Sequence, residues 1–448
     1  MASASARADG AAPARVRTLR ERFARVRAAT VALARPLSEA DASVQSMPDA
    51  SPTKWHLAHT TWFFETFALE RFEPAFAPHD PAYRVLFNSY YNSIGEQHPR
   101  PLRGLVTRPG LAEVLAYRAA VDSRVERLLD APHDALCDLV ELGLEHEQQH
   151  QELVLTDLQH ALAQNPLLPA YAPRPQRPAE GVPTPLAWAA FDEALCEIGD
   201  AGAGFAFDNE RPRHRVFVEA FEIASRAVTN GEWIAFVEDG GYATPSLWLS
   251  DGWTRRCAEG WEAPLYWQRA EAGAPWERFT LGGLVPAHAD EPVCHVSYYE
   301  ADAFATWAGA RLPTEAEWER TAERFAPAPD AGRRAGFAEG GALRPLGCAG
   351  DADDASPTLG AHAGAPAVRH LLGHVWEWTR SPYVAYPRFR PAAGALGEYN
   401  GKFMADQWVL RGGSCATPAE HVRTTYRNFF PAAARWQFSG LRLARDPA

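Results

Sequence analysis

The chain has 448 residues, of which 46% are hydrophobic and 11% aromatic, so it is a folded protein too long for one ordinary core. Its formal net charge is −12 and no basic stripe runs along it, which argues against nucleic acid or an anionic membrane surface as partner. No apolar run is long enough to span a membrane, and six cysteines without a C-x-x-C pair suit a reducing compartment. We expect a cytoplasmic protein of two domains that acts on small molecules.

The N-terminal part of the chain carries helical periodicity. Residues 1–14 lack the apolar core of a secretion signal, and we expect them to form a disordered tail. In residues 15–164, apolar side chains recur at three- and four-residue steps in four segments. These segments cover residues 15–33, about 54–69, 111–128 and 133–163. Four helices of this length predict a helical bundle.

Two segments interrupt these patterns. Residues 81–110 form an aromatic-rich stretch longer than an ordinary connection, which favours a functional loop. Residues 165–185, NPLLPAYAPRPQRPAEGVPTP, are too rich in proline to continue a helix, so they predict a stiff linker and a domain boundary. The second domain therefore covers residues 186–448.

The second domain mixes short strands with short helices. Residues 214–224 alternate like a half-buried strand. Three capping boxes, in which a hydroxyl and a glutamate three residues later bind each other's backbone amides, predict helix starts. They are Thr229 with Glu232, Ser297 with Glu300, and Thr314 with Glu317. Together with the bundle, these signals place the chain in the α+β class.

One short segment carries a metal-binding pattern. HEQQH, residues 146–150, fits H-E-x-x-H, in which two histidines one helical turn apart bind an ion and the glutamate is the base of a zinc protease. A protease needs a third ligand, but Leu153 and Thr156 stand where a glycine and a third histidine would have to lie. The proline-rich linker leaves no following helix to supply a glutamate instead. The pattern therefore indicates a metal site without a protease.

A further histidine ligand is available on the second predicted helix. In WHLAHTTWFFE, His56 and His59 lie three residues apart, and a bundle can project either of them toward the fourth helix. Either can complete a three-histidine site with His146 and His150. The alternative is that all are core histidines bonded to backbone groups. Four histidines on two helices beside a long aromatic loop favour the metal site.

Longer motifs in both domains resemble those of one known family. The motifs are HLAHTTWFFE (56–65), LFNSYYNSIGEQHPRPLRGL (86–105), HEQQHQELVLTD (146–157), FDNERPRH (207–214), GARLPTEAEWE (309–319), VWEWT (375–379), VLRGGSCATP (409–418) and TYRNFFPAAARWQFSGLRLA (425–444). They resemble the ergothioneine-biosynthesis sulfoxide synthases, which join a DinB-type four-helix bundle to a domain similar to the formylglycine-generating enzyme. The resemblance covers nearly the whole chain and implies an irregular, C-type-lectin-like second domain.

The resemblance assigns roles to the helical residues. It implies that His59, His146 and His150 bind Fe(II), and that the glutamate of the HEQQH motif has no catalytic role. Gln149 matches a family residue that contacts the histidine-derived substrate. His56 then lies beside the ligand set and outside it.

The family's reaction needs an open, redox-active centre. Three neutral imidazoles leave Fe(II) three open octahedral positions, enough for a substrate imidazole, a thiolate and dioxygen. Zinc has no redox chemistry and could not activate oxygen. The resemblance implies that the substrate is hercynine, the Nα-trimethylated betaine of histidine, that O2 is the co-substrate, and that the product carries sulfur on imidazole C2.

A tyrosine pair lies in the long aromatic loop. Tyr90 and Tyr91 form an SYY motif that resembles the pair characteristic of the family branch using free cysteine. A phenol there can give a proton or a hydrogen bond to reduced oxygen, which favours C–S bond formation over plain thiol oxidation. The alternative is two core tyrosines with satisfied hydroxyls. The sequence leaves open which of the two acts.

Candidate substrate contacts lie near the C-terminus. A trimethylammonium group cannot donate hydrogen bonds and needs aromatic faces, which Phe429, Phe430 and Trp436 can offer. Asn428 matches a family asparagine that holds the amino-acid end of hercynine. Phe430 stands where the glutamylcysteine-using branch has an acidic residue, so its presence fits a smaller donor. The alternative for the phenylalanines is core packing.

Two arginines are candidates for binding the carboxylate of the sulfur donor. Arg84 and Arg103 both lie in the aromatic loop, and a guanidinium can bind a carboxylate in bidentate geometry. The alternative for each is an arginine that solvates the surface. Because the iron ligands come from the bundle and Asn428 from the second domain, we expect both domains to line one active site.

The sequence does not decide whether the donor is cysteine or a selenosugar. Five positions depart from a typical cysteine-using member, namely Asn92, Tyr298, His374, Trp408 and Ala432. A related branch, the selenoneine synthases, uses the same iron site to attach selenium from a selenosugar to hercynine. Cysteine is the favoured donor, and a selenosugar is the alternative.

Two rival functions follow from the domain types. DinB-type bundles also occur as metal-binding stress proteins, and domains like the second one occur as carbohydrate-binding modules, so a non-catalytic binding module is one rival. A copper oxidase like the formylglycine-generating enzyme would need a second cysteine near Cys415, and none lies close in sequence. The three histidines and the tyrosine pair favour the iron enzyme.

Overall fold

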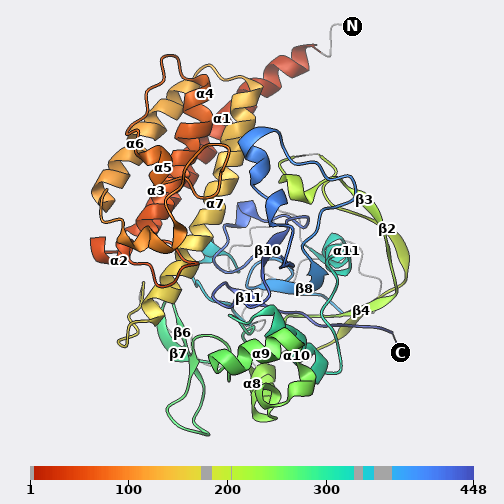
Figure 1. Ribbon diagram of the computed structural model, residues 1–448. Coiled ribbons are helices and arrows are strands. Elements are labelled where there is room, and N and C mark those ends of the chain that lie inside the picture. The colour runs from red at the N-terminus through yellow and green to blue at the C-terminus, as the bar shows by residue number, and fades with distance from the viewer. Residues whose placement is uncertain (1–4, 173–183, 203, 327–335, 348–365, 448) are drawn as a thin grey trace. The chain divides into compact units, whose positions relative to one another are not determined.

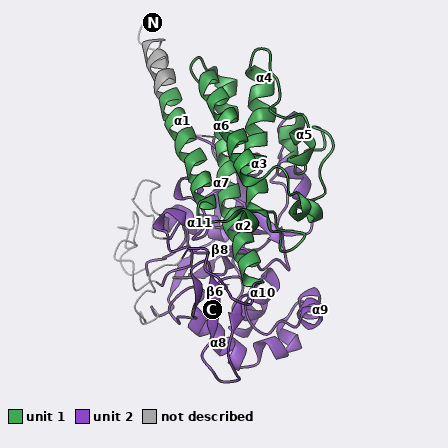
Figure 2. Cartoon of the chain, turned by 90° about the vertical axis from the view of Figure 1, so that its left-hand side faces the viewer, with its two compact units in different colours: residues 1–164, 394–398 green, residues 165–393, 399–448 purple. Residues whose placement is uncertain are grey.

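The chain folds into two compact units (Figures 1 and 2). The computed structural model describes residues 5–172, 184–202, 204–326, 336–347 and 366–447, with the backbone alone described for 5–14. The first unit contains residues 1–164 and 394–398, and the second contains 165–393 and 399–448. Most of the predicted linker, at 173–183, and Cys348 lie outside the described residues.

The first unit is a helical bundle. Its helices are α1 (Ser5–Ala34), α2 (Glu39–Ser43), α3 (Thr53–Phe63), the π-helix η1 (Phe64–Leu69), α4 (Glu70–Phe72), α5 (Tyr83–Leu86), the 3-10 helix η2 (Arg100–Leu105), α6 (Leu111–Leu128) and α7 (Asp134–Ala163). The predicted bundle is confirmed, because α1, α3, α6 and α7 pack against one another along their apolar faces.

Helix α1 begins further toward the N-terminus than the sequence analysis expects. It starts at Ser5, inside the segment expected to be a disordered tail. That segment is rich in alanine, the residue with the highest helix propensity, and a helix anchored by later packing can extend into it. The anchoring residues of α1 include Leu19, Phe23 and Val26, which are all buried.

The second predicted helix is observed as α3 followed directly by a π-helical segment. The backbone stays right-handed helical from α3 through η1 into α4. A π-helical segment shifts the side-chain register and often lies at a functional site. At its start, the ring of Phe63, the last residue of α3, lies 4.7 Å from that of His146 on α7 and 4.8 Å from that of Phe67 in η1.

A buried carboxylate ties the four long helices together. Glu147 on α7 is fully buried and accepts hydrogen bonds from Arg27 Nη1 at 2.7 Å and Thr30 Oγ1 at 2.6 Å, both on α1. Its Oε1, the oxygen that accepts Thr30, also accepts Arg118 Nη2 of α6 at 2.6 Å. Burial would raise the pKa of this carboxyl, but Arg118 and Arg27 outweigh burial and lower it to about 2.

The two arginines carry this network on to α3. Arg118 Nη1 donates to the carbonyl of Leu57 at 3.0 Å and to Thr60 Oγ1 at 2.9 Å, and Arg27 Nη2 donates to Thr61 Oγ1 at 3.0 Å. The glutamate of the HEQQH motif is therefore a structural centre of the bundle. Its position fixes how α7 is turned against the other three helices.

Within its described residues, the second unit combines four α-helices with four small sheets (Figure 1). The helices are α8 (Asn230–Glu238), α9 (Ser250–Glu259), α10 (Tyr298–Trp307) and α11 (Glu315–Phe325). The strands are β1 (Trp188–Phe191), β2 (Ala194–Ile198), β3 (His214–Val218), β4 (Phe221–Ala224), β5 (Trp267–Gln268), β6 (Glu277–Thr280), β7 (Gly283–Pro286), β8 (Trp376–Pro382), β9 (Gln407–Arg411), β10 (Asn428–Pro431), β11 (Ser439–Gly440) and β12 (Ala444–Arg445). The chain is thus α+β, as predicted.

The sheets have the strand orders β1-β4-β12, β10-β9-β8-β11, β2-β3 and β5-β6-β7. All pairs are antiparallel except β11 with β8. The single strand predicted over 214–224 is observed as two, β3 and β4, which join different sheets. The three predicted capping boxes are confirmed, because Thr229, Ser297 and Thr314 are the N-caps of α8, α10 and α11.

A second buried ion pair holds the four-stranded sheet against α11. Glu377 on β8 accepts Arg442 Nη2 at 2.8 Å and Trp318 Nε1 of α11 at 2.7 Å, and all three side chains are fully buried. These contacts anchor β8, which pairs with β9, and β9 pairs with β10. The strands that carry Trp408 and Asn428 therefore stand on a rigid base.

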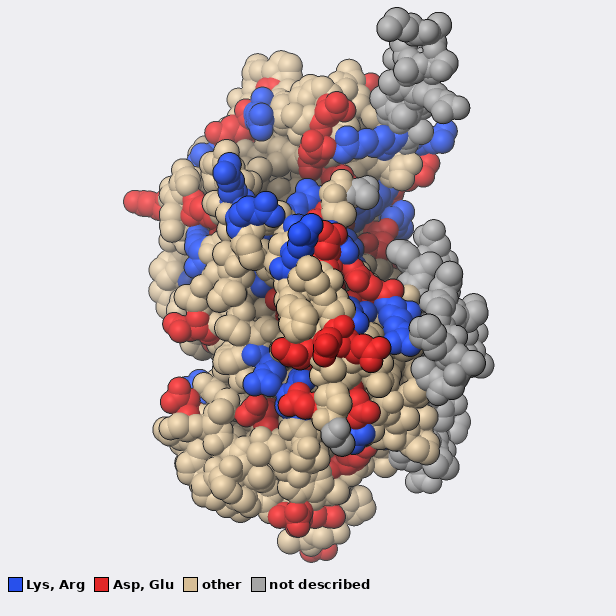
Figure 3. All heavy atoms as spheres, turned by 90° about the vertical axis from the view of Figure 1, so that its right-hand side faces the viewer, with Lys and Arg blue, Asp and Glu red and all other residues tan. Residues whose placement is uncertain are grey.

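The described surface mixes both signs of charge. On the face shown in Figure 3, acidic and basic side chains are interspersed. Among the residues that the structure places, no helix is both long and apolar enough to cross a membrane.

Replacing Glu147 with glutamine is expected to destabilise the bundle. The change leaves Arg27 and Arg118 buried without a full countercharge, which typically costs about 3–5 kcal/mol of unfolding free energy. Urea denaturation followed by circular dichroism measures it. Glu141→Gln is the matched control on the same helix, because Glu141 is half-buried and its pairs with Arg15 and Arg22 are worth less than about 1 kcal/mol.

The difference in unfolding free energy between the wild type and Glu147→Gln should depend on pH. Folding lowers the Glu147 pKa from 4.5 to about 2, so its contribution is complete above 4.5 and is lost as the pH falls toward 2. The stability difference between the wild type and Glu147→Gln should therefore narrow below pH 4.5. A difference that stays constant there would contradict the assignment.

Candidate metal centre

Three histidine side chains converge inside the first unit. His59 comes from α3, and His146 and His150 come from α7, which packs beside α3. Each offers one ring nitrogen, and these nitrogens all lie within 4.8 Å of one another. His59 is 0% exposed, His146 1% and His150 9%. No other group of three histidine, cysteine or carboxylate side chains converges like this in the described part of the chain.

Hydrogen bonding prepares His59 to bind a cation. Its Nδ1 lies 2.7 Å from the carbonyl oxygen of Phe87, which can only accept, so Nδ1 carries the proton and donates. The lone pair of the neutral ring is then on Nε2. That atom lies 3.2 Å from Nε2 of His146.

The spacing between His59 and His146 fits an octahedral ion. With metal–nitrogen bonds of about 2.1 Å, adjacent ligand nitrogens of such an ion lie roughly 3 Å apart. The observed 3.2 Å between His59 and His146 agrees with that value. A hydrogen bond would account for two of the three converging nitrogens, whereas a cation accounts for all three. The donor set of three imidazoles also leaves coordination positions for substrates.

Burial keeps these imidazoles neutral. It lowers the pKa of His146 to about 3. Burial and the neighbouring histidines hold the pKa values of His59 and His150 well below their usual range. Neutral rings offer lone pairs at physiological pH, and metal ligation requires them.

The structure separates the two histidines that the α3 pattern leaves open. His59 faces His146, with ring centroids 5.0 Å apart, whereas His56 lies behind His150, with its Nδ1 2.8 Å from Nδ1 of His150. Two tryptophans stack on the ring of His59, Trp55 at 4.7 Å and Trp62 at 5.5 Å. His59 is therefore held from its ring faces and from its Nδ1.

The tyrosine pair lies one aromatic ring away from this centre. Tyr91 is fully buried, and its ring lies 5.6 Å from that of Trp62, which itself stacks on His59. Tyr90 is half-buried and stacks on Tyr91 at 4.7 Å. The structure thus brings the pair and the histidines into one aromatic cluster of the bundle.

A carboxylate about 300 residues further along the sequence holds the loop that carries the tyrosines. Glu398 accepts hydrogen bonds from the backbone amides of Asn92 at 2.9 Å and Ser93 at 2.8 Å, and from the Ser93 hydroxyl. It belongs to the 3-10 helix η8 (Gly394–Glu398), which packs with the first unit. Sequence reasoning missed this residue, because neither its spacing nor its neighbours link it to the loop.

The two candidate arginines have different surroundings. Arg84 is exposed and pairs with Glu70 at 2.7 Å. Arg103 is 4% exposed, and its guanidinium carbon lies 3.4 Å from the ring centroid of Trp55. Its Nη1 donates to Ser51 at 2.9 Å, its Nε has no hydrogen-bond partner among the described residues, and burial lowers its pKa to about 9. Of the two, Arg103 is the one that lies beside the histidine centre.

The predicted substrate contacts of the second unit lie on β10 and beside it. Alternation along the strand puts Asn428 and Phe430 on one face and Phe429 on the other, where its ring stacks on Tyr383 at 4.0 Å. The ring of Trp436 lies 5.9 Å from that of Phe430. Gln149, on α7 of the first unit, is half-buried.

Of the five positions that differ from a typical cysteine-using member of the family, Tyr298, Trp408 and Ala432 lie next to Phe430. The rings of Tyr298 and Trp408 stack with centroids 3.9 Å apart, and the amide of Tyr298 donates to the carbonyl of Ala432 at 3.0 Å. Trp408 is the register partner of Phe430 across β9 and β10. His374 is elsewhere in the same unit, stacked on His370 at 3.8 Å.

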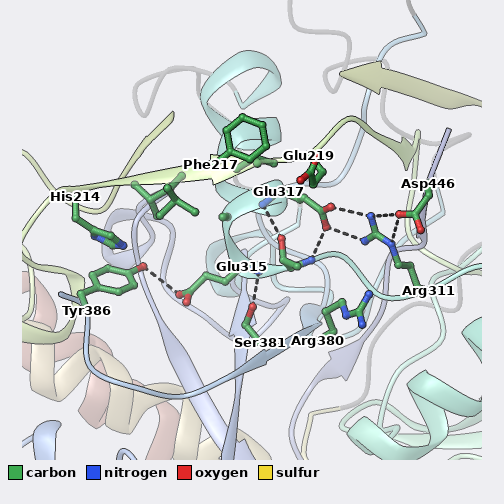
Figure 4. A pocket seen from close by; sticks show the side chains of 15 residues that line it. His214, Phe217, Glu219, Arg311, Glu315, Glu317, Arg380, Ser381, Tyr386 and Asp446 are labelled. Carbon is green, nitrogen blue, oxygen red and sulfur yellow. Dashed lines mark hydrogen bonds and ion pairs between the residues drawn. The ribbon is translucent and has the colours of Figure 1, made fainter. Parts of the chain in front are cut away.

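A cavity of about 420 Å³ in the second unit is lined by none of the predicted site residues (Figure 4). Several of its polar and charged side chains bond to one another. Arg311 pairs with Glu317 and Asp446, and the hydroxyl of Tyr386 donates to Glu315 at 3.2 Å. The residues that line the cavity all belong to the second unit, and the three histidines all belong to the first.

Comparisons with known proteins agree with the domain order. Residues 22–154 match the DinB superfamily, and residues 189–447 match the sulfatase-modifying factor enzyme 1-like domain. The formylglycine-generating enzyme of Streptomyces coelicolor is 31% identical over 271 residues, which cover 53% of this chain and 80% of that protein. This similarity is therefore limited to part of the chain.

Other relatives match along both units. The hercynine oxygenase of Mycolicibacterium thermoresistibile is 36% identical over 421 residues, covering 91% of this chain and 90% of that protein. The hercynine oxygenase of Mycobacterium tuberculosis is 36% identical over 432 residues, covering 95% and 97%. With its bundle, its second domain and nearly its full length matched, the chain belongs to the hercynine oxygenases, the ergothioneine sulfoxide synthase family.

Proposed function

We propose that the protein is an Fe(II)- and O2-dependent enzyme that forms a carbon–chalcogen bond at imidazole C2 of hercynine. The observation that carries the proposal is the buried set of three neutral histidines in a chain that matches hercynine oxygenases along both units. The favoured reaction joins hercynine C2–H, a cysteine S–H and O2 into a sulfoxide and water. Iron held by His59, His146 and His150 would supply the redox chemistry that activates dioxygen.

The chain's own residues would orient the substrates and manage protons. Tyr90 and Tyr91 are proposed to give a proton or hydrogen bond to reduced oxygen, and their place in the aromatic cluster beside Trp62 supports this. Gln149 and Asn428 are proposed to hold hercynine. Aromatic faces suit its trimethylammonium group, which cannot donate hydrogen bonds.

The donor carboxylate has a candidate partner in Arg103. This arginine is buried beside the histidine centre and keeps hydrogen-bonding capacity on Nε, whereas Arg84 already pairs with Glu70 at the surface. A buried guanidinium binds a carboxylate more strongly than an exposed one, because water competes less. Cysteine, with one carboxylate and a thiol, fits this partner.

A selenosugar is the second candidate donor, and one observation favours it. Tyr298, Trp408 and Phe430 form an aromatic surface at three adjacent positions, two of them departures from typical cysteine-using members. Such a surface has no carboxylate to hold an amine, but it can pack against the apolar face of a sugar ring. The same iron chemistry would then join hercynine C2–H, the Se–H of the selenosugar and O2 into a selenoxide and water, and a separate reductive cleavage of the Se–sugar bond by an added thiol would give selenoneine.

The ligand assignment predicts three equivalent losses. Changing His59, His146 or His150 to alanine should abolish turnover and remove stoichiometric Fe(II) binding, because each supplies one of the three converging nitrogens. Iron content after anaerobic loading and product formation measure both effects. The exposed His133 provides the control, and His133→Ala should keep both. Full metal and turnover in His59→Ala, with both lost in His56→Ala, would show that the wrong α3 histidine has been assigned.

The donor assignment predicts the outcome of a competition. Iron-loaded protein is given hercynine, oxygen and equal concentrations of cysteine, glutamylcysteine and a selenosugar, and product masses are read. We expect the cysteine adduct to dominate and glutamylcysteine to react poorly, because Phe430 leaves no carboxylate for its amine. A dominant glutamylcysteine adduct would refute the role of Phe430.

A dominant selenium adduct of hercynine would instead indicate that the aromatic surface of Tyr298, Trp408 and Phe430 selects the donor. In that case Trp408→Ala should lower formation of the selenium adduct more than tenfold, while formation of the cysteine adduct changes little. Trp307→Ala is the matched control, because this tryptophan lies on α10 and bonds to Asp239 at 2.8 Å.

A further inference from the structure

A hydrogen-bonded chain runs behind the histidine centre through the core of the bundle. The ring of His56 on α3 bridges His150 and Asp157, which are both on α7. His56 Nδ1 lies 2.8 Å from Nδ1 of His150, and its Nε2 lies 3.1 Å from Oδ2 of Asp157. All three side chains are 9% exposed or less. His150 and Asp157 are two helical turns apart, so they lie on the same face of α7.

One arrangement of protons satisfies this chain when His150 binds a cation. The ligating nitrogen of His150 must be bare, and its Nδ1 faces His56, so Nε2 binds the ion and Nδ1 carries the proton. That proton is donated to Nδ1 of a neutral His56. His56 then has its own proton on Nε2 and donates it to Asp157, because a carboxylate can only accept.

The far end of the chain is anchored to the start of α3. Oδ2 of Asp157 also accepts the backbone amide of Ser51 at 2.8 Å, and the Ser51 hydroxyl accepts Nη1 of Arg103 at 2.9 Å. The ring of Trp55 meets His56 edge-on at 5.7 Å. Groups outside the hydrogen-bonded chain of His150, His56 and Asp157 therefore hold both the carboxylate and the bridging imidazole in place.

We propose that His56 and Asp157 are positioning residues of the metal centre. They fix the tautomer and ring orientation of His150 and increase the electron density on its ligating nitrogen. The inference rests on the proposed function only in that His150 binds a metal, and it goes beyond that function by assigning two residues that bind neither iron nor substrate. Removing such a partner from behind a ligand histidine typically weakens metal binding about 10–100-fold.

Co(II) titration of the full-length protein tests this without substrate or oxygen. The dissociation constant is measured by competition with a chelator, and the visible absorption of bound Co(II) reports its ligand geometry. For His56→Asn and Asp157→Asn we expect binding weakened about 10–100-fold and a changed Co(II) spectrum. The thermal midpoint of the metal-free proteins should stay near that of the wild type. Should one variant fail to fold, the other carries the test, since each breaks a different hydrogen bond.

His160→Asn is the matched control. His160 is also on α7, but its Nδ1 bonds to the Ser46 hydroxyl at 2.7 Å, outside the chain of His150, His56 and Asp157. Its Co(II) affinity should equal that of the wild type. If the chain acts as one unit, the double variant of His56 and Asp157 should lose no more affinity than His56→Asn alone.

Two outcomes would overturn the inference. Wild-type Co(II) affinity and spectrum in both single variants would show that the hydrogen bonds of His56 and Asp157 do not affect the metal. Additive losses in the double variant would show that Asp157 does not act through His56. A wild-type protein that binds neither Co(II) nor Fe(II) would overturn the proposed metal centre itself, which distinguishes the two failures.

Discussion

The geometry of the first unit depends on one buried carboxylate. Glu147 receives hydrogen bonds from α1 and α6, and its two arginine partners continue to α3, so the helix that carries His146 and His150 can pack in only one rotation. Because Glu147 directly follows His146, this rotation turns both α7 histidines toward His59. An ion pair of this kind is a weak source of net stability, since desolvation offsets much of its attraction. Its value here is that it defines a single arrangement of four helices.

The same arrangement explains how a buried site can be ready for a cation. Each α3 histidine has a fixed partner, His59 at the carbonyl of Phe87 and His56 at Asp157. These partners place protons away from the centre. Burial lowers the pKa values of His59, His146 and His150 and keeps these three rings neutral, so their lone pairs converge without a countercharge among the ligands. A centre of neutral ligands leaves the full charge of the ion available to substrates. The rings of Trp55 and Trp62 stack on His59, and Tyr91 packs against Trp62.

Sequence patterns predicted the parts of this architecture that local rules determine. The helical periodicity located α1, α3, α6 and α7, and the three capping boxes located α8, α10 and α11. The i, i+4 spacing of His146 and His150 indicated a shared ion, yet spacing alone could not choose between His56 and His59, because both lie on the face of α3 toward α7. The structural role of Glu147 depends on contacts with residues more than 100 positions away from it in α1, which no local pattern records. The same holds for Glu398 and the tyrosine loop, whereas Asp157 could have been suspected, since it lies two turns beyond His150 on the same face.

The proposed function requires the three-histidine centre to activate oxygen for the conversion of hercynine. The most direct measurement is oxygen consumption after anaerobic loading with Fe(II), recorded with a thiol donor in the presence and absence of hercynine. We expect hercynine to accelerate oxygen uptake strongly, with one O2 consumed for each hercynine converted. Oxygen uptake that hercynine leaves unchanged, with no adduct of hercynine formed, would contradict it.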